Sequence, residues 1–186
     1  MMHEEVPETR GVDTHGLQLF VNLPAREKLT APRVLHLDAG RAPVDAPGDG
    51  VEVRVLTGQS GQATGLIAPV PAVTMLDVRL APNAAYEYRA ADGDTVIALG
   101  WDGGGTAGPA ATISASSAVV FARERGAAQF RAGASGLRFL LLAGTPIGER
   151  VVFRGPFAMS DEAQAEDAFR RYRAGEMGRL TSSFEG

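Results

Sequence analysis

The chain has 186 residues, of which 45% are apolar, 22% are charged and 6% are aromatic, and its formal net charge is −4 at pH 7. This composition excludes a disordered or fibrous chain, and the length provides for one ordinary hydrophobic core or two small ones. Because cysteine is absent, the chain has no disulfide framework and no thiolate nucleophile, and a metal site in it needs His, Asp or Glu ligands.

The N-terminal segment carries one pair of residues with metal-ligand chemistry, His3 and Glu5. On a strand, residues i and i+2 point to the same side, so the imidazole and the carboxylate would project together. Such a pair is half of a site suited to iron, manganese or a similar divalent metal. A stable site needs three or four protein ligands, and the only other imidazoles are His15 and His36. Taken by itself, a pair of this kind at a chain end is more typical of a solvated, frayed terminus.

Residues 39–50 are rich in proline and glycine and indicate a linker. Beyond it, apolar and polar residues alternate with a period of two, which predicts half-buried antiparallel strands at residues 51–55, 76–80 and 86–89. Continuous apolar runs predict three strands buried on both faces, at residues 95–99, 118–121 and 138–142. Turn residues separate the runs at 82–83, 92–94 and 135–136. Short strands at this spacing indicate an all-β sandwich or barrel.

Residues 100–108, with four glycines between 101 and 108, predict a loop between two strands. The segment lacks the Gly-Lys-Ser/Thr ending of a phosphate-binding loop and opens no helix, so it does not indicate nucleotide binding. Trp101, at its start, could stack on a ligand, but a lone tryptophan beside a loop is more typical of a packing residue.

One helix is predicted near the C-terminus, at about residues 161–174. Ser160 is suited to cap it, Asp161 and Glu162 favour the positive first turn, and Gly175 follows the last turn. A narrow apolar stripe runs along it at positions i, i+3, i+4 and i+7, namely Ala165, Ala168, Phe169 and Tyr172. This pattern predicts a helix that packs on the protein.

The sequence assigns no other catalytic or cofactor-binding residue. There is no Gly-x-Ser-x-Gly, and the serines at 114, 116 and 117 have no histidine nearby. The 22 acidic and 18 basic residues, without a basic cluster, argue against nucleic acid. The longest apolar run, 139–143, is far shorter than the roughly 20 residues of a membrane span. The N-terminus is acidic, unlike a signal peptide, so we expect a cytoplasmic protein that contacts no membrane.

Three segments carry a resemblance to one known family. Residues 16–25 read Gly-Leu-Gln-Leu-Phe-Val-Asn-Leu-Pro-Ala, and residues 28–32 continue the match. Residues 139–149 read Phe-Leu-Leu-Leu-Ala-Gly-Thr-Pro-Ile-Gly-Glu, and residues 155–159 read Gly-Pro-Phe-Ala-Met before the predicted helix. In this order, they resemble the Gly-Leu-Gln-Leu-Trp-Val-Asn-Leu-Pro, Leu-Leu-Gly-Gly-Glu-Pro-Leu-Gly-Glu and Gly-Pro-Phe-Val-Met-Asn segments of the pirin family.

Pirins are similar to bicupins, in which two antiparallel barrels lie face to face and the first holds an iron-type metal. The resemblance implies four ligands: two histidines from a His-x-His strand, then a histidine and a glutamate from a His-x-Glu segment shortly before Gly-Leu-Gln-Leu. His3 and Glu5 match the last two. Nothing matches the His-x-His, and neither His15 nor His36 lies in such a motif. The resemblance therefore implies a pirin without most of its N-terminal barrel, in which iron or another divalent metal is weakly bound or absent.

The resemblance also implies the domain organisation. It makes residues 1–37 a remnant of the N-terminal cupin barrel, 38–50 a linker, 51–160 the C-terminal cupin barrel, and 161–186 a helix and tail. We expect an all-β, cupin-type antiparallel barrel, accompanied by remnant strands of the first barrel and one C-terminal helix. The remnant would expose an apolar face, at Leu17, Leu19 and Val21, so we expect self-association through this open edge.

Two functions remain open. Some pirins are dioxygenases that open the flavonol quercetin. The first hypothesis is therefore a protein related to metal-dependent quercetin 2,3-dioxygenases that is inactive as this chain, and that acts on a flavonol-like small molecule only when His-x-His strands are supplied. Other pirins are nuclear regulators. The second hypothesis is therefore a non-catalytic cupin module that binds a protein partner or a small ligand in a regulatory role.

Overall fold

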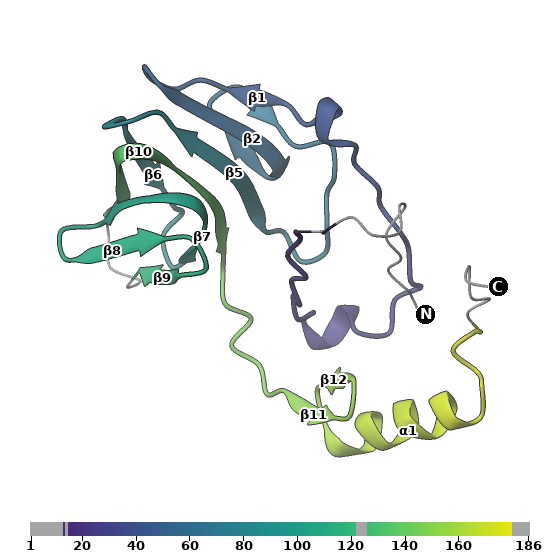
Figure 1. Ribbon diagram of the computed structural model, residues 1–186. Helices are drawn as coiled ribbons and strands as arrows, with labels where there is room; N and C mark the ends of the chain where they lie inside the picture. Colours follow the sequence, from purple (N-terminus) through teal and green to yellow (C-terminus); the bar gives the residue numbers. More distant parts are fainter. Residues whose placement is uncertain (1–12, 14, 122–125, 180–186) are drawn as a thin grey trace. The chain divides into compact units, whose positions relative to one another are not determined.

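The computed structural model describes residues 13, 15–121 and 126–179. The chain divides into two compact units (Figure 1). We call residues 34–146 the barrel unit. Residues 1–33 together with 147–186 form the terminal unit, which is described over residues 13, 15–33 and 147–179. No helix among the described residues is long and apolar enough to cross a membrane.

The barrel unit is built from an eight-stranded antiparallel sheet. Its strands follow the order β1-β2-β5-β10-β7-β8, with β6 paired to β10 and β9 paired to β7. Their bounds are β1 (Val44–Asp45), β2 (Val51–Thr57), β5 (Thr74–Leu80), β6 (Ala85–Arg89), β7 (Thr95–Ala107), β8 (Ala111–Ser114), β9 (Ala118–Phe121) and β10 (Ala127–Gly144). A separate small hairpin pairs β3 (Gln59–Ser60) with β4 (Ala63–Thr64). Each of the six predicted strands lies within an observed strand, and the all-β prediction is confirmed.

Strand β10 contributes to both sides of the barrel (Figure 1). Its first part, 127–131, pairs with β6, whereas 137–143 pairs with β5, and β7 accompanies it along both parts. The two parts are separated by a register shift between Ala132 and Leu137. We predicted a turn at 135–136, but Gly136, with φ of +81°, instead belongs to this irregularity inside one long strand. Such irregularities bend a strand and increase its twist, which lets the sheet close on itself.

The predicted glycine loop at 100–108 is wrong, because residues up to Ala107 belong to β7. The glycines occur there because neighbouring main chains approach closely. A Cβ atom at Gly103 would lie 2.3 Å from the carbonyl oxygen of Gly136, and one at Gly105 would lie 2.1 Å from that of Arg131. Glycine inside a strand marks a bulge or a close backbone approach, and both occur here.

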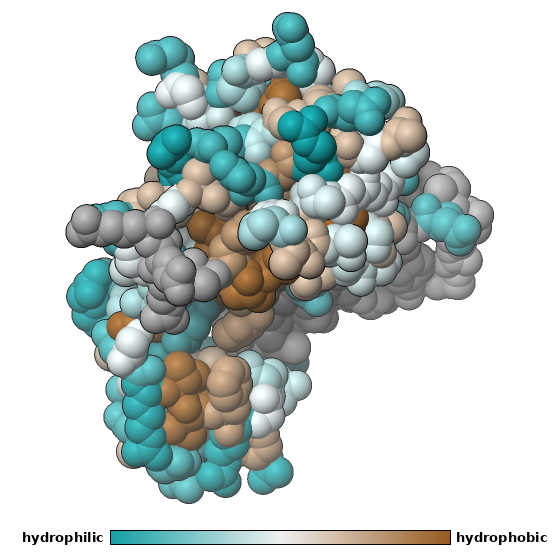
Figure 2. All heavy atoms as spheres, turned by 90° about the vertical axis from the view of Figure 1, so that its left-hand side faces the viewer, coloured by the Kyte–Doolittle hydropathy of each residue, from teal (hydrophilic) through white to brown (hydrophobic). Residues whose placement is uncertain are grey.

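The hydrophobic core lies inside the barrel unit. It follows from the alternation of the strands: in β2, every second side chain, starting with Val51, is buried. The largest fully buried side chains are Phe139, Leu76, Ile113, Leu141, Val53, Val55 and Val78. Apolar side chains also reach the surface elsewhere, and Figure 2 shows one side of the molecule on which they form patches bordered by polar ones.

The terminal unit contains a hairpin of β11 (Val152–Arg154) and β12 (Phe157–Met159), followed by the helix α1 (Glu162–Arg173). The helix confirms the prediction and buries Ala165 and Ala168. Its predicted cap is wrong by one residue. Asp161 is extended, with φ of −148°, and its Oδ1 accepts a hydrogen bond of 2.8 Å from the backbone amide of Gln164. Ser160, one residue earlier, has a buried hydroxyl oxygen without a hydrogen bond in the described structure.

The N-terminal part of the terminal unit forms no strand over residues 15–33; one short 3-10 helix, Ala25–Glu27, is its regular structure. The expected remnant strand around Leu17 and Val21 is therefore not observed in the described residues. A strand is defined by main-chain pairing, and no described strand pairs with this segment. Of the three apolar side chains expected to be exposed, Leu17 and Val21 are exposed and Leu19 is half-buried.

The two units divide the chain differently from the expected domains. Residues 147–160, which we assigned to the C-terminal barrel, group with the helix, since β11 and β12 both contact α1. The expected linker, 38–50, lies within the barrel unit and includes the short 3-10 helix Ala39–Arg41 and the edge strand β1.

The neighbouring residues Gly104 and Gly105 of β7 provide a test of the close approach between the main chains of β7 and β10. We expect Gly105→Ala to lower the stability by more than about 2 kcal/mol, because its Cβ would collide with a main-chain oxygen. Gly104→Ala is the matched control, because the nearest atom to its Cβ would be 3.4 Å away, at the Ile113 oxygen. Urea unfolding of both variants measures the difference. Equal unfolding midpoints would contradict this explanation of the glycine-rich strand.

Candidate functional site

The predicted metal ligands His3 and Glu5 lie outside the described residues, and their role stays a prediction. His15 is exposed in the terminal unit. His36, in the barrel unit, is also exposed, and its Nε2 lies 3.0 Å from Oδ1 of Asp38. Among the described residues, no group of three or more His, Asp or Glu side chains could hold a metal ion. The described part of the chain therefore does not fit a resident metal by itself.

An aromatic cluster occupies the interior of the barrel unit. The Phe130 ring stacks on Phe139 at a centroid distance of 4.3 Å and meets Phe121 edge-on at 5.4 Å. It also stacks on Tyr86, at a centroid distance of 6.3 Å. Both Phe130 and Phe139 are buried. Rings and aliphatic side chains offer no lone pairs to a metal, so this interior supports the fold rather than coordination chemistry.

Tyr86 is the polar group of this cluster. Burial raises the pKa of its hydroxyl to about 12, although a hydrogen bond with Ser60 opposes the shift. The Ser60 hydroxyl donates in turn to Oδ2 of Asp45 over 2.7 Å. Strands β6, β3 and β1 are thereby connected at the polar side of the core. Because Tyr86 keeps its proton far above neutral pH, it serves as a hydrogen-bonding group and not as a base.

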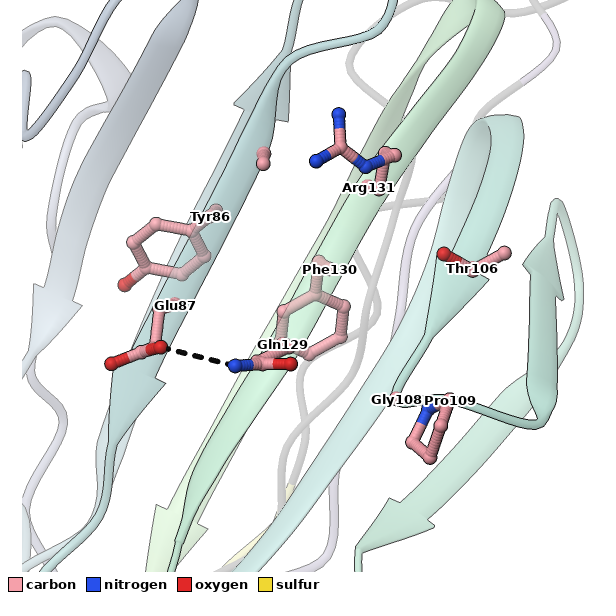
Figure 3. A pocket seen from close by; sticks show the side chains of 9 residues that line it. Tyr86, Glu87, Thr106, Gly108, Pro109, Gln129, Phe130 and Arg131 are labelled. Atoms are coloured by element: carbon pink, nitrogen blue, oxygen red, sulfur yellow. Dashed lines mark hydrogen bonds between the residues drawn. The ribbon is translucent and has the colours of Figure 1, made fainter.

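A groove of about 360 Å³ lies along β6, β10 and β7 (Figure 3). At its rim, Gln129 Nε2 donates to Oε2 of Glu87 over 3.2 Å, and Arg131 Nη1 donates to the Asn83 carbonyl, also over 3.2 Å. All three side chains are exposed. The groove offers hydrogen-bonding groups to a small ligand but no nucleophile beside a base, so it is suited to binding and not to catalysis.

A larger groove, of about 780 Å³, lies within the terminal unit. One wall is the segment 28–32 and the other is the face of α1 that carries Ala163, Asp167 and Arg171. Met159 and Met177 add flexible apolar surface. Its volume falls in the range of about 300–1,000 Å³ that is typical of small-molecule sites.

Residues from each of the three segments that carry the family resemblance contact one another in the terminal unit. The Ala25 amide donates to Oε2 of Glu149 over 2.6 Å. Lys28 Nζ donates to Oδ1 of Asn22 over 2.5 Å and to the Ala158 carbonyl over 3.0 Å. Spacing in the sequence gave no sign of these contacts, which join residues up to 130 positions apart. Only the resemblance of the three segments to the pirin family could have indicated these contacts.

Comparison with known proteins agrees with this arrangement. The pirin C-terminal cupin domain matches residues 75–178, more than half of the chain. The chain belongs to the pirin family. It is 37% identical over 180 residues to Pirin-1 of Arabidopsis thaliana, covering 93% of this chain and 61% of that protein. It is 32% identical over 181 residues to PA3240 of Pseudomonas aeruginosa, whose name assigns it provisionally to the quercetin 2,3-dioxygenases, covering 94% of this chain and 63% of that protein.

The fold resembles that of a quercetin 2,3-dioxygenase from Acinetobacter baumannii, with a TM-score of 0.78 and 24% identity. This crystal structure matches 87% of the pirin-family chain and 56% of the dioxygenase. The likeness confirms the cupin-type fold. The chain spans less than two thirds of the length of each of these three proteins.

The raised pKa of Tyr86 predicts a loss of stability at alkaline pH. An unfolded tyrosine ionises near pH 10, whereas folded Tyr86 ionises near 12. The stabilisation is therefore complete below pH 10 and is lost as pH rises through 12, by up to about 3 kcal/mol. Unfolding free energies of wild type and Tyr86→Phe, measured from pH 8 to 12, should show wild type losing stability relative to Tyr86→Phe above pH 10.

The exposed Tyr172 supplies the control for this measurement. Tyr172→Phe should follow the wild-type alkaline profile, because its hydroxyl is not buried in the core. If the difference between wild type and Tyr86→Phe stayed constant up to pH 12, burial of the Tyr86 hydroxyl would not be the cause.

Proposed function

We propose that this chain is a pirin-type cupin protein related to metal-dependent quercetin 2,3-dioxygenases that does not catalyse the reaction as it stands. The observation that carries the proposal is the donor-poor barrel: its described interior is filled by aromatic and aliphatic side chains, and its one histidine, His36, is exposed. The similarity to PA3240 and the dioxygenase-like fold support the relationship. Catalysis of this kind needs a metal, and the described residues of the barrel unit include no group of donors that could hold one.

His3 and Glu5 are the residues we propose as metal ligands, in a site for iron or another divalent metal. A bound ion of this kind supplies Lewis acidity, which polarises an oxygen-containing substrate. Two ligands leave most coordination positions to water, so binding is weak. We do not include His15 and His36 in the set, since neither lies in a motif of the family's metal ligands.

Metal content tests this assignment directly. After dialysis, we expect well below one iron, nickel or zinc ion per chain, and weak binding on titration with each metal. His3→Ala and Glu5→Gln should abolish the residual binding, whereas His36→Ala, the matched control at an exposed imidazole, should leave it unchanged. One tightly held metal ion per chain would overturn the proposal that this chain carries half a site.

Quercetin turnover is the functional test. We expect the rate with this chain and added iron(II) to equal that of buffer, because a dioxygenase needs metal and substrate held together in a closed cavity. The assay follows quercetin absorbance and oxygen consumption. Turnover by this chain, abolished by His3→Ala and retained by His36→Ala, would show that it is an enzyme.

The alternative is a non-catalytic module that binds a small ligand or a protein partner in a regulatory role. The 780 Å³ groove of the terminal unit favours it, since its volume suits a flavonol-sized molecule. Saturable binding of quercetin without turnover, measured by calorimetry, would support this alternative. Self-association through Leu17, Leu19 and Val21 also stays a prediction, supported by the exposure of Leu17 and Val21.

A further inference from the structure

The groove of the terminal unit contains a positive charge that has no negative partner among the described residues. The Lys28 ammonium is partly buried, and its two acceptors, Oδ1 of Asn22 and the carbonyl oxygen of Ala158, are both neutral. An ammonium group carries three N–H donors, so one donor of Lys28 is left for a ligand. A partly buried cation that is held only by neutral groups favours the binding of an anion.

The other charged side chains that line this groove already have partners of opposite charge. Asp167 accepts a hydrogen bond from Arg170, one turn along α1. Arg171 donates through Nε to Oε2 of Glu176 over 3.2 Å, and both residues line the groove. Each of these pairs neutralises its own charge. Within the described part of the chain, Lys28 is therefore the lining charge that still lacks a counter-charge.

The apolar part of the groove is aliphatic and elongated. Its helical wall recurs every four positions from 163 to 171, so the groove follows α1 for about 12 Å. Met159 precedes the helix and Met177 follows it, and both thioether side chains adapt to what they contact. Lys28 belongs to the Met159 end, because its Nζ donates to the carbonyl of Ala158. The described lining residues include no aromatic ring.

We propose that this groove binds a small aliphatic carboxylate, with its carboxylate at Lys28 and its chain along α1. The inference rests on the second function proposed above, a non-catalytic module that binds a small ligand, and it names the class of that ligand. The charge of Lys28 determines the head group, since a neutral molecule of the same shape leaves the ammonium without a counter-charge. The aliphatic lining determines the tail. Leu29, which is 73% exposed, supplies further apolar surface for the chain to cover.

Octanoate and octanol, which share a chain and differ in charge, are the probes. Calorimetry should show saturable, one-to-one binding of octanoate that is about tenfold tighter than that of octanol, because only octanoate forms a charge-assisted hydrogen bond. From hexanoate to decanoate, affinity should rise about two- to fourfold with each methylene, since each one buries more apolar area. Equal affinities for octanoate and octanol, or no saturable binding of octanoate at millimolar concentration, would overturn the proposal.

Asn22→Asp supplies the missing counter-charge while Lys28 stays in place. The new carboxylate replaces an amide whose Oδ1 lies 2.5 Å from Nζ, so the hydrogen bond is kept and the ammonium gains an ion-pair partner. Octanoate binding should weaken about tenfold, and octanol binding should not change. Asn83→Asp, at an exposed position of the barrel unit, is the matched control with the same change of net charge, and it should alter neither. Equal weakening in both variants, or none in Asn22→Asp, would contradict the proposal.

The sequence also allows the site to be located directly, because Lys28 is the only lysine of the chain. A carbon-13 label at the lysine Cε therefore gives one NMR signal. Octanoate should shift this signal in step with the calorimetric titration, and octanol should shift it less. Saturable octanoate binding with an unmoved signal would place the site elsewhere and overturn the proposal. Its failure leaves the metal and quercetin assays unaffected. Tight metal binding or quercetin turnover would overturn the proposed function without changing the octanoate result.

Discussion

The barrel depends on close main-chain contact along the glycine-rich half of β7. At Gly100, Gly103 and Gly105, a Cβ atom would lie within 2.3 Å of a carbonyl oxygen of β8 or β10. Because the backbones touch, β7 can hold β8 on one side and β10 on the other while both bend. Strand β10 can then leave β6 and continue beside β5. Because β10 pairs with β6 over its first part and with β5 over its second, the sheet encloses the phenylalanine cluster.

The sequence predicted the strands well, because the side chains of 51–55 or 76–80 reveal their inner and outer faces through local alternation. It did not predict that the glycine-rich residues up to Ala107 belong to β7. Glycine is needed at position 105 because a Cβ atom there would collide with the carbonyl oxygen of Arg131, which is distant in the chain and comes close only after folding. The choice of Asp161 over Ser160 as cap likewise depends on backbone angles that neither residue type fixes. The alternation of neighbouring side chains could be predicted from the sequence, whereas contacts between residues distant in the chain could not.

The candidate site shows the same difference between features that are local in the sequence and contacts that form on folding. The spacing of His3 and Glu5 suggests ligand chemistry because it is local. The family resemblance, by contrast, rests on residues whose described role is structural: Asn22, Lys28 and Glu149 tie three distant segments together. A match over such segments is strong evidence for the fold, because their contacts recur only when the segments pack in the same way. It is weaker evidence for activity, which depends on the metal ligands.

Strand β10 also divides its side chains between the core and the outer face of the sheet. Over its second part, Leu137, Phe139, Leu141 and Ala143 point into the core, whereas Arg138, Leu140 and Leu142 face outward. A sequence that is apolar at both sets cannot tell whether the outer set is covered by its own chain or by another molecule. In the described structure, the core is complete without the outer set. Outward residues can therefore change with less effect on stability than the inward ones.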